Sequence, residues 1–177
     1  AITDVRVSNF RSLANVEVEL NDLTVLIGAN NAGKTSFLDA LFAAIGSGRK
    51  TLSHDDVRLA PGEALPPKER KVVIDLRIRP VGSDGKVLDK FPEGSFWTAL
   101  WGNGIAIDPV EFYEFMPIRT SLSWNGAKAE YVVERSFLKE WRAFADWIDT
   151  PFQSTPIRAA QLEPVALHYI DAKRDLD

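Results

Sequence analysis

The sequence predicts a mixed α/β fold: a sheet that carries a glycine-rich loop, with an accessory antiparallel β-subdomain inserted around residues 71–136. Three observations predict it. Apolar and polar residues alternate with period two in residues 2–20 and 71–80, which is typical of strands with one buried face. A short, continuous apolar run at residues 23–27 leads through glycines into a segment with helical spacing. The length of 177 residues suits one domain with a single core.

The N-terminal elements are the clearest. Residues 2–20 are expected to form two short strands joined across residues 9–12. Residues 23–27 are expected to form a strand buried on both faces, because the run is apolar without alternation. In residues 36–45 the apolar side chains recur at helical spacing and Gly46 supplies a stop signal, so we expect a helix there.

The middle of the chain is less regular. Residues 49–71 are polar and contain several prolines, as in a surface connection. The alternation in residues 71–80 predicts a half-exposed antiparallel strand with Asp75 on its solvent side. Residues 81–117 mix aromatic residues with glycine and proline and indicate only strand and turn.

A hairpin is expected at residues 125–126, an Asn-Gly pair that tolerates positive φ. A two-residue turn there pairs Trp124 with Ala127 and Leu122 with Ala129, and puts these side chains on one face. The paired residues on that face are apolar or Thr, so we expect the hairpin to be structural and not catalytic.

Two elements are expected near the C-terminus. Residues 137–148 carry apolar side chains at i, i+4, i+7 and i+11, which predicts an amphipathic helix with Ser136 as its cap. Residues 165–170 are largely apolar and are expected to form the last strand, leading into Asp171.

The amino-acid composition excludes several kinds of functional site. The chain has no cysteine, which excludes disulfides, thiolate metal sites and cysteine nucleophiles. Its two histidines, His54 and His168, lie far apart in the sequence and leave little material for a histidine-rich metal site. A net charge of -4 argues against a surface that is basic throughout. No apolar run is long enough to cross a bilayer and no leader is visible, so we expect a cytoplasmic location and no membrane partner.

Residues 28–35 fit the pattern G-x-x-x-x-G-K-T, the phosphate-binding P-loop, between an expected strand and an expected helix. Glycines let backbone N–H groups surround an anion, and the helix adds the positive end of its dipole. Lys34 is expected to neutralise the β- and γ-phosphates of ATP, and the Thr35 hydroxyl to bind Mg²⁺. The candidate cofactor-binding residues of this segment are Gly28, Asn30, Asn31, Ala32, Gly33, Lys34, Thr35 and Ser36.

Residues 2–13, followed by residues 26–41, resemble the start of ABC-type ATPase heads. They are most similar to the SMC/RecF-like heads and, within these, to the OLD (overcoming lysogenization defect) family of ATP-dependent nucleases. Residues 169–175 also resemble the OLD pattern at the point where the first lobe gives way to the second. The resemblance implies ATP and Mg²⁺ as cofactors, a homodimer of heads that enclose ATP, and DNA as the substrate.

The resemblance also implies roles for single residues. Arg11 and Ser12 match a segment that lies beside the nucleotide, the alternative being a solvent-exposed turn arginine. Asp171 stands where the family has its Q-loop and is a candidate metal ligand, although the family usually has Gln there. Residues 165–171 also fit a Walker B strand, but Ala172 follows where ABC heads have a catalytic Glu.

Residues 72–75 fail as Walker B because alternation places the acid on a solvent face, and no L-S-G-G signature is present. We therefore expect an N-terminal fragment, inactive alone, of an ATPase that binds ATP and, in the intact dimer, hydrolyses it. The OLD resemblance couples this activity to DNA processing or repair by an endonuclease. Two alternatives stay open: a non-hydrolytic, nucleotide-gated DNA clamp and a small-molecule P-loop kinase.

Overall fold

The computed structural model describes residues 1–20, 31–46 and 52–174. In these ranges one seven-stranded, fully antiparallel sheet runs in the order β2-β1-β3-β5-β6-β7, with β4 paired to β5. Its strands are β1 Ile2–Phe10, β2 Leu13–Glu19, β3 Val72–Ile78, β4 Ala106–Ile107, β5 Glu114–Asn125, β6 Glu130–Leu138 and β7 Phe152–Pro156. The helices are α1 Asn31–Ala44, α2 Phe96–Trp101 and α3 Ala159–Arg174, with short 3₁₀ turns η1 His54–Asp56, η2 Gly102–Gly104 and η3 Phe144–Asp149.

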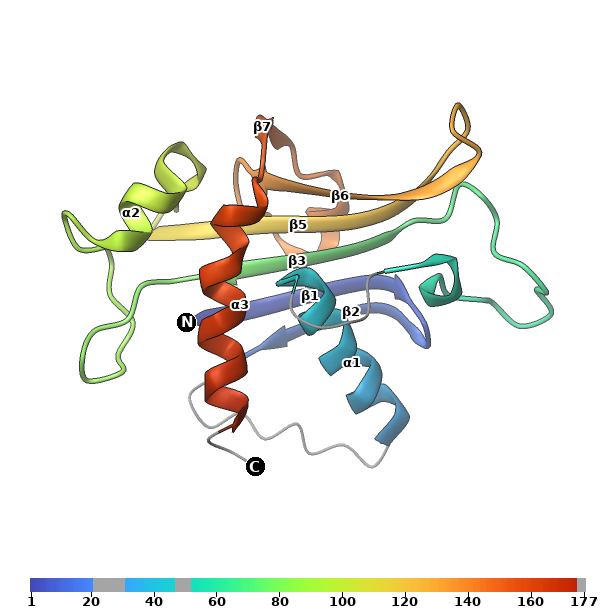
Figure 1. The fold of residues 1–177 in the computed structure, drawn as a ribbon, viewed down its shortest axis with the longest axis horizontal. Helices are drawn as coiled ribbons and strands as arrows, with labels where there is room; N and C mark the ends of the chain where they lie inside the picture. Colours follow the sequence, from blue (N-terminus) through green and yellow to red (C-terminus); the bar gives the residue numbers. More distant parts are fainter. Residues whose placement is uncertain (21–30, 47–51, 175–177) are drawn as a thin grey trace.

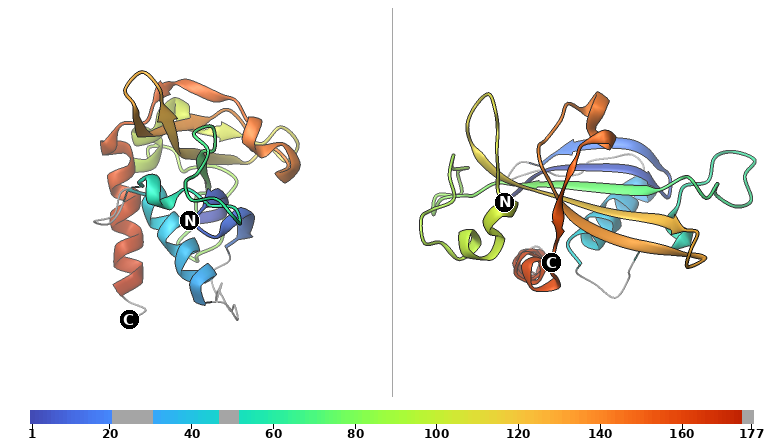
Figure 2. Two further views of the ribbon diagram at one scale, coloured as in Figure 1. Left: turned by 90° about the vertical axis from the view of Figure 1, so that its right-hand side faces the viewer. Right: turned by 90° about the horizontal axis from the view of Figure 1, so that it is seen from above.

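Helices α1 and α3 lie on one face of the sheet, and η3 lies on the other (Figures 1 and 2). Period-two alternation decides which side chains meet the helices: Val5 and Val7 of β1 and Ile74 and Leu76 of β3 are fully buried in the main core. The mixed α/β fold with an antiparallel sheet is confirmed. The expected strand at residues 23–27 lies outside the described residues.

The N-terminal strands and the first helix are confirmed. β1 and β2 pair antiparallel across the turn at residues 11–12. Helix α1 ends before Gly46, which has φ +70° and therefore a backbone conformation that glycine adopts without strain. No helix in the described ranges is long and apolar enough to cross a membrane.

Strand β3 is not half-exposed, as alternation predicts, but buried on both faces. Asp75 is 1% exposed, and Arg119 of β5 donates to both of its carboxylate oxygens, at 2.8 and 2.9 Å. The remaining N–H groups of Arg119 donate to the carbonyl oxygens of Trp147 and Ile148, so η3 covers this face. The solvent-side expectation for Asp75 is wrong because a segment far along the chain supplies the second layer.

The hairpin is confirmed, but its register differs from the expected one. Trp124 pairs with Tyr131 and Asn125 with Glu130, so the loop contains residues 126–129. The partner is displaced by an even number of residues, which keeps the same side chains on each face. The loop residue with positive φ is Ala129, at +52°, and not Gly126. The Asn125 side chain closes the turn by accepting from the backbone N–H of Lys128 at 3.0 Å.

The helix expected over residues 137–148 is wrong. Ser136 and Phe137 continue β6, where Phe137 pairs with Ile118 and its ring lies so close to Gly104 that a Cβ there would come within 2.8 Å. Only Phe144–Asp149 forms a turn of 3₁₀ helix. The helical spacing of these apolar residues is coincidental, because Phe137 belongs to β6 whereas Phe144 and Ile148 lie in η3.

The strand expected at residues 165–170 is also wrong, because these residues lie in α3. Leu162 and Val165, three positions apart, are both buried in the main core. The helix is fixed at its start by the Gln161 side chain, which donates to the carbonyl oxygen of Leu100 at 3.0 Å, while the Trp101 indole N–H donates to the carbonyl oxygen of Gln161. A short apolar run is compatible with either element, and tertiary packing selects the helix.

Candidate nucleotide-binding site

The N-terminal turn of α1 presents the P-loop residues that the structure describes. Lys34 and Thr35 are exposed, whereas Ser36 and Phe37 are buried. Further along the helix, buried apolar residues pack α1 against β1 and β3. The buried stripe fixes the helix on the sheet, and the exposed first turn is left facing solvent.

This turn has the electrostatics of an anion site. It contains no acidic residue, so no carboxylate competes with a bound anion for the positive end of the helix dipole. Lys34 adds a full positive charge beside that end. Together they suit a phosphate group, as the sequence pattern predicts.

The residues that the structure describes also fit a Mg²⁺ ion held mainly by phosphate. Within those residues, no three His, Asp or Glu side chains form a cluster that could hold a metal ion. Mg²⁺ on a nucleotide takes most of its ligands from phosphate and water, with one or two protein oxygens. The exposed Thr35 hydroxyl suits that single protein ligand.

Two of the other predicted P-loop residues, Gly28 and Asn30, lie outside the described residues. Asn31 and Ala32 form the start of the α1 backbone. Gly33 is half-buried in the first turn. The contacts of this loop with phosphate remain predictions.

Arg11 occupies a strained turn between β1 and β2. Asn9 and Arg11 both have positive φ, at +56° and +51°, which is unusual for residues other than glycine. Backbone hydrogen bonds hold the turn against η1: Arg11 N–H donates to Asp56 O at 2.7 Å, and Arg58 N–H donates to Asn9 O at 2.9 Å. The strain is therefore maintained by pairing to a segment about forty-five residues away.

The Arg11 guanidinium joins two carboxylates from different elements. Its Nη1 lies 2.5 Å from Asp39 of α1 and its Nε lies 3.1 Å from Asp56 of η1. Burial alone would lower the pKa of Arg11, but the hydrogen bonds and charges of these two carboxylates outweigh it and raise the pKa. We refer to Arg11, Asp39 and Asp56 as the Arg11 cluster.

The Arg11 cluster adjoins the P-loop helix. Asp39 lies four residues after Thr35, and residues at that spacing are neighbours on one face of a helix. The alternative of a freely exposed turn arginine is wrong, since the Arg11 side chain is 31% exposed and pairs with two carboxylates. The direct nucleotide contact of Arg11 stays a prediction, as does that of exposed Ser12.

Sequence reasoning did not find Asp39 or the site role of Asp56. Residues 54–56 form η1, where Ser53 N–H donates to the Asp56 carboxylate at 2.9 Å. The available signal for Asp39 was its position one turn beyond Thr35. The pairing itself depends on contacts across 28 and 45 residues, which no local pattern indicates.

Asp171 lies in α3 and not at the end of a strand, so the strand that supports a Walker B or Q-loop role is absent. Its side chain lies outside the described part. The C-terminal end of α3 lies at the same end of the molecule as the N-terminal end of α1 (Figures 1 and 2). The metal role of Asp171 stays a prediction, and the strand on which that prediction was based is a helix.

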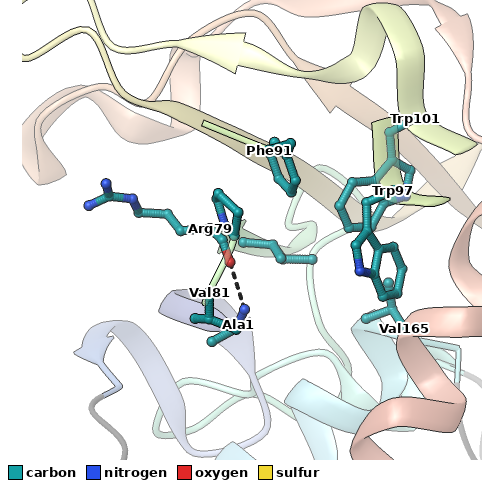
Figure 3. A pocket seen from close by; sticks show the side chains of 9 residues that line it. Ala1, Arg79, Val81, Phe91, Trp97, Trp101 and Val165 are labelled. Atoms are coloured by element: carbon teal, nitrogen blue, oxygen red, sulfur yellow. Dashed lines mark hydrogen bonds between the residues drawn. The ribbon is translucent and has the colours of Figure 1, made fainter. Parts of the chain in front are cut away.

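A separate apolar cavity of about 100 Å³ lies between the start of β1 and α2 (Figure 3). Ala1 and Val81 border it on one side, and Trp97, Trp101 and Val165 on the other. Its volume is below the several hundred Å³ of ordinary ligand sites. We interpret it as a packing gap and not as part of the nucleotide site.

Two sequence comparisons relate this chain to known proteins. Residues 1–81 match the AAA ATPase domain family. A 54-residue stretch is 44% identical to the DNA replication and repair protein RecF of Glaesserella parasuis serovar 5 (strain SH0165). That match covers 30% of this chain and 15% of that RecF, so the chain spans a small part of the curated relative's length.

Solved structures show weaker likenesses. One comes from work on ATP-driven dimerization and DNA-stimulated activation of SMC ATPases, with TM-score 0.46, 15% identity, and coverage of 91% of this chain and 79% of that one. Another is the recombination mediator protein RecF-ATPrS, with TM-score 0.39, 14% identity, and coverage of 76% and 26%. The family match, and not these likenesses, indicates an ATPase-type domain in the N-terminal part of the chain.

Proposed function

We propose that this chain is the ATP-binding lobe of an SMC/RecF-like ATPase that acts in DNA processing. The observation that carries the proposal is the exposed, acid-free first turn of α1, with Lys34 and Thr35 accessible and the Arg11 cluster alongside. The match of residues 1–81 to an ATPase domain family supports the same chemistry.

In this proposal Lys34 neutralises the β- and γ-phosphates and Thr35 offers its hydroxyl to the Mg²⁺ ion that accompanies them. Arg11 holds the β1–β2 turn against α1, and so keeps the nucleotide-facing end of the helix in place. Mg²⁺, when bound, supplies charge neutralisation and orients the phosphates.

Three finer features belong to the proposal. The first is that the intact protein is an OLD-like ATPase coupled to an endonuclease. The second is that hydrolysis requires a homodimer with ATP enclosed between the heads. The third is that the chain is an N-terminal part of that protein and hardly hydrolyses ATP alone. The OLD-like ending at residues 169–175 and the missing signature motif support them.

Binding of a fluorescent ATP analogue with Mg²⁺ tests the site. Lys34→Ala should weaken binding about tenfold or more, because a charge-assisted contact to phosphate is lost. Lys90→Ala, which removes an exposed lysine from a distant loop, is the matched control and should bind as the unmodified chain does. Equal affinity of all three proteins would contradict the proposed site.

Phosphate release tests the fragment expectation. The 177-residue chain should release phosphate from ATP at a rate close to the uncatalysed one. Steady hydrolysis that Lys34→Ala abolishes would show that the catalytic set is already present. In the longer protein, phosphate release blocked by Lys34→Ala supports the ATPase, whereas tight binding without release supports a nucleotide-gated clamp.

A further inference from the structure

Among the residues that the structure describes, α1 covers only part of the helix-facing side of the β5–β6 hairpin. The α1 C-terminus covers it as far as Thr120 and Arg135, which donate to the carbonyl oxygens of Ala44 and Ala43 at 3.4 and 2.9 Å. Trp124 of β5 lies two pairs further along the same face, opposite Tyr131. Beyond the end of α1, the described residues place half-buried aromatic side chains on this face and no helix.

A pocket of about 520 Å³ occupies that place. Its walls come from the hairpin, from the segment around η1 with Ser53 and His54, and from the loop that carries Lys68. The volume lies within the range of sites that hold small organic ligands. The pocket shares no lining residue with the P-loop turn, since none of its lining residues belongs to α1.

The aromatic pair forms two walls at a steep angle. The Trp124 and Tyr131 rings lie 5.3 Å apart with an interplanar angle of 74°. The Lys68 ammonium lies 3.8 Å from the centroid of the Trp124 ring. A flat aromatic ligand can stack on the Trp124 ring with its edge against Tyr131. Lys68 is the cation in the pocket wall that can pair with a negative charge on the ligand, and the Glu130 carboxylate also lines the pocket.

We propose that this pocket binds an unpaired base of single-stranded nucleic acid, with Trp124 stacking on the base, Tyr131 contacting its edge and Lys68 pairing with its phosphate. An exposed cation–π contact is weaker than base stacking on an aromatic ring, so the exposed Lys68 side chain moves from the ring to the phosphate when a base enters. A base in a duplex is stacked on both faces and paired along one edge, and it does not reach such a pocket. The proposal does not depend on ATP binding at α1.

Fluorescence anisotropy with a fluorescein-labelled oligothymidylate of fifteen nucleotides at low salt tests it. Trp124→Leu and Tyr131→Leu should each weaken binding about tenfold, and Trp124→Phe should retain most of the affinity. Lys68→Gln should weaken binding more than Lys128→Gln, a matched loss of one exposed charge on the same hairpin outside the pocket. A duplex of the same length should bind more weakly, and the matching oligouridylate shows whether the sugar matters.

Equal effects of Lys68→Gln and Lys128→Gln, together with full binding by Trp124→Leu, would overturn the proposal in favour of non-specific charge attraction. Should the leucine variants not fold, photocrosslinking of the unmodified chain to an oligonucleotide containing 5-iodouracil gives the answer: adducts on Trp124 or Tyr131 support it, and adducts only elsewhere overturn it. Displacement of the ATP analogue by the oligonucleotide would show that both bind at one site and would also overturn the proposal. Loss of ATP binding in Lys34→Ala with unchanged oligonucleotide binding keeps the two sites distinct.

Discussion

Substituting Arg11 should loosen the attachment of the β1–β2 turn to α1 and η1. The guanidinium makes ion pairs with Asp39 and Asp56, whose side chains are 32% and 12% exposed. Solvent screening limits each pair to at most about 1 kcal/mol, so Arg11→Ala should lower the free energy of unfolding by about 1–2 kcal/mol. Alanine keeps the cost of positive φ at this position, +51°.

Glycine separates the two contributions at Arg11. Arg11→Gly loses the same ion pairs as Arg11→Ala, but glycine adopts positive φ without strain. Its free energy of unfolding should therefore be about 1 kcal/mol higher than that of Arg11→Ala. Arg11→Gly should therefore unfold in urea at a higher midpoint than Arg11→Ala. Identical midpoints for the two variants, or no change in either, would refute the assignment of strain and ion pairing to this turn.

ATP affinity then distinguishes the roles of Arg11. Asp39→Asn leaves the guanidinium in place but removes its partner on α1. If Arg11 only positions the helix, Arg11→Ala and Asp39→Asn should weaken ATP binding alike. If Arg11 contacts the nucleotide, Arg11→Ala should weaken binding while Asp39→Asn leaves it unchanged or strengthens it.

Three further outcomes are expected. Arg119→Met should cost about 3–5 kcal/mol in urea unfolding, because the Asp75 carboxylate, 1% exposed, loses its counter-ion; the double variant with Asp75→Leu should recover most of this. Ala129→Gly should raise the melting temperature, since glycine relieves up to about 1 kcal/mol of strain at φ +52°. The pKa of Glu63 is lowered in the folded chain, chiefly by the hydrogen bond from Arg70. The ionised Glu63 therefore stabilises the fold above its ordinary pKa, and this stabilisation is lost as the pH falls through the lowered pKa of the folded state. Between about pH 6 and about pH 3, Glu63→Gln should lose less stability than the unmodified chain.

The sequence by itself determined the elements whose signals are local. The alternation in residues 2–20 and 71–80 specified β1, β2 and β3, because each strand has one face against the main core. The glycine-lysine-threonine pattern before a helical repeat specified the exposed turn of α1 and the candidate site with it. The Asn-Gly pair located the hairpin, though not its register, which the Asn125 hydrogen bond and positive φ at Ala129 decide.

Only the tertiary structure decided what depends on distant partners. Phe137 belongs to a strand because Ile118 pairs with it, and Val165 belongs to a helix because the core receives it at helical spacing. Arg11 is held by carboxylates 28 and 45 residues away, and Asp75 is buried because Arg119 and η3 cover it. A short apolar run has nearly the same local free energy in a strand as in a helix, and the local sequence around a charged residue does not decide whether it is buried or exposed. Long-range burial and pairing make both choices.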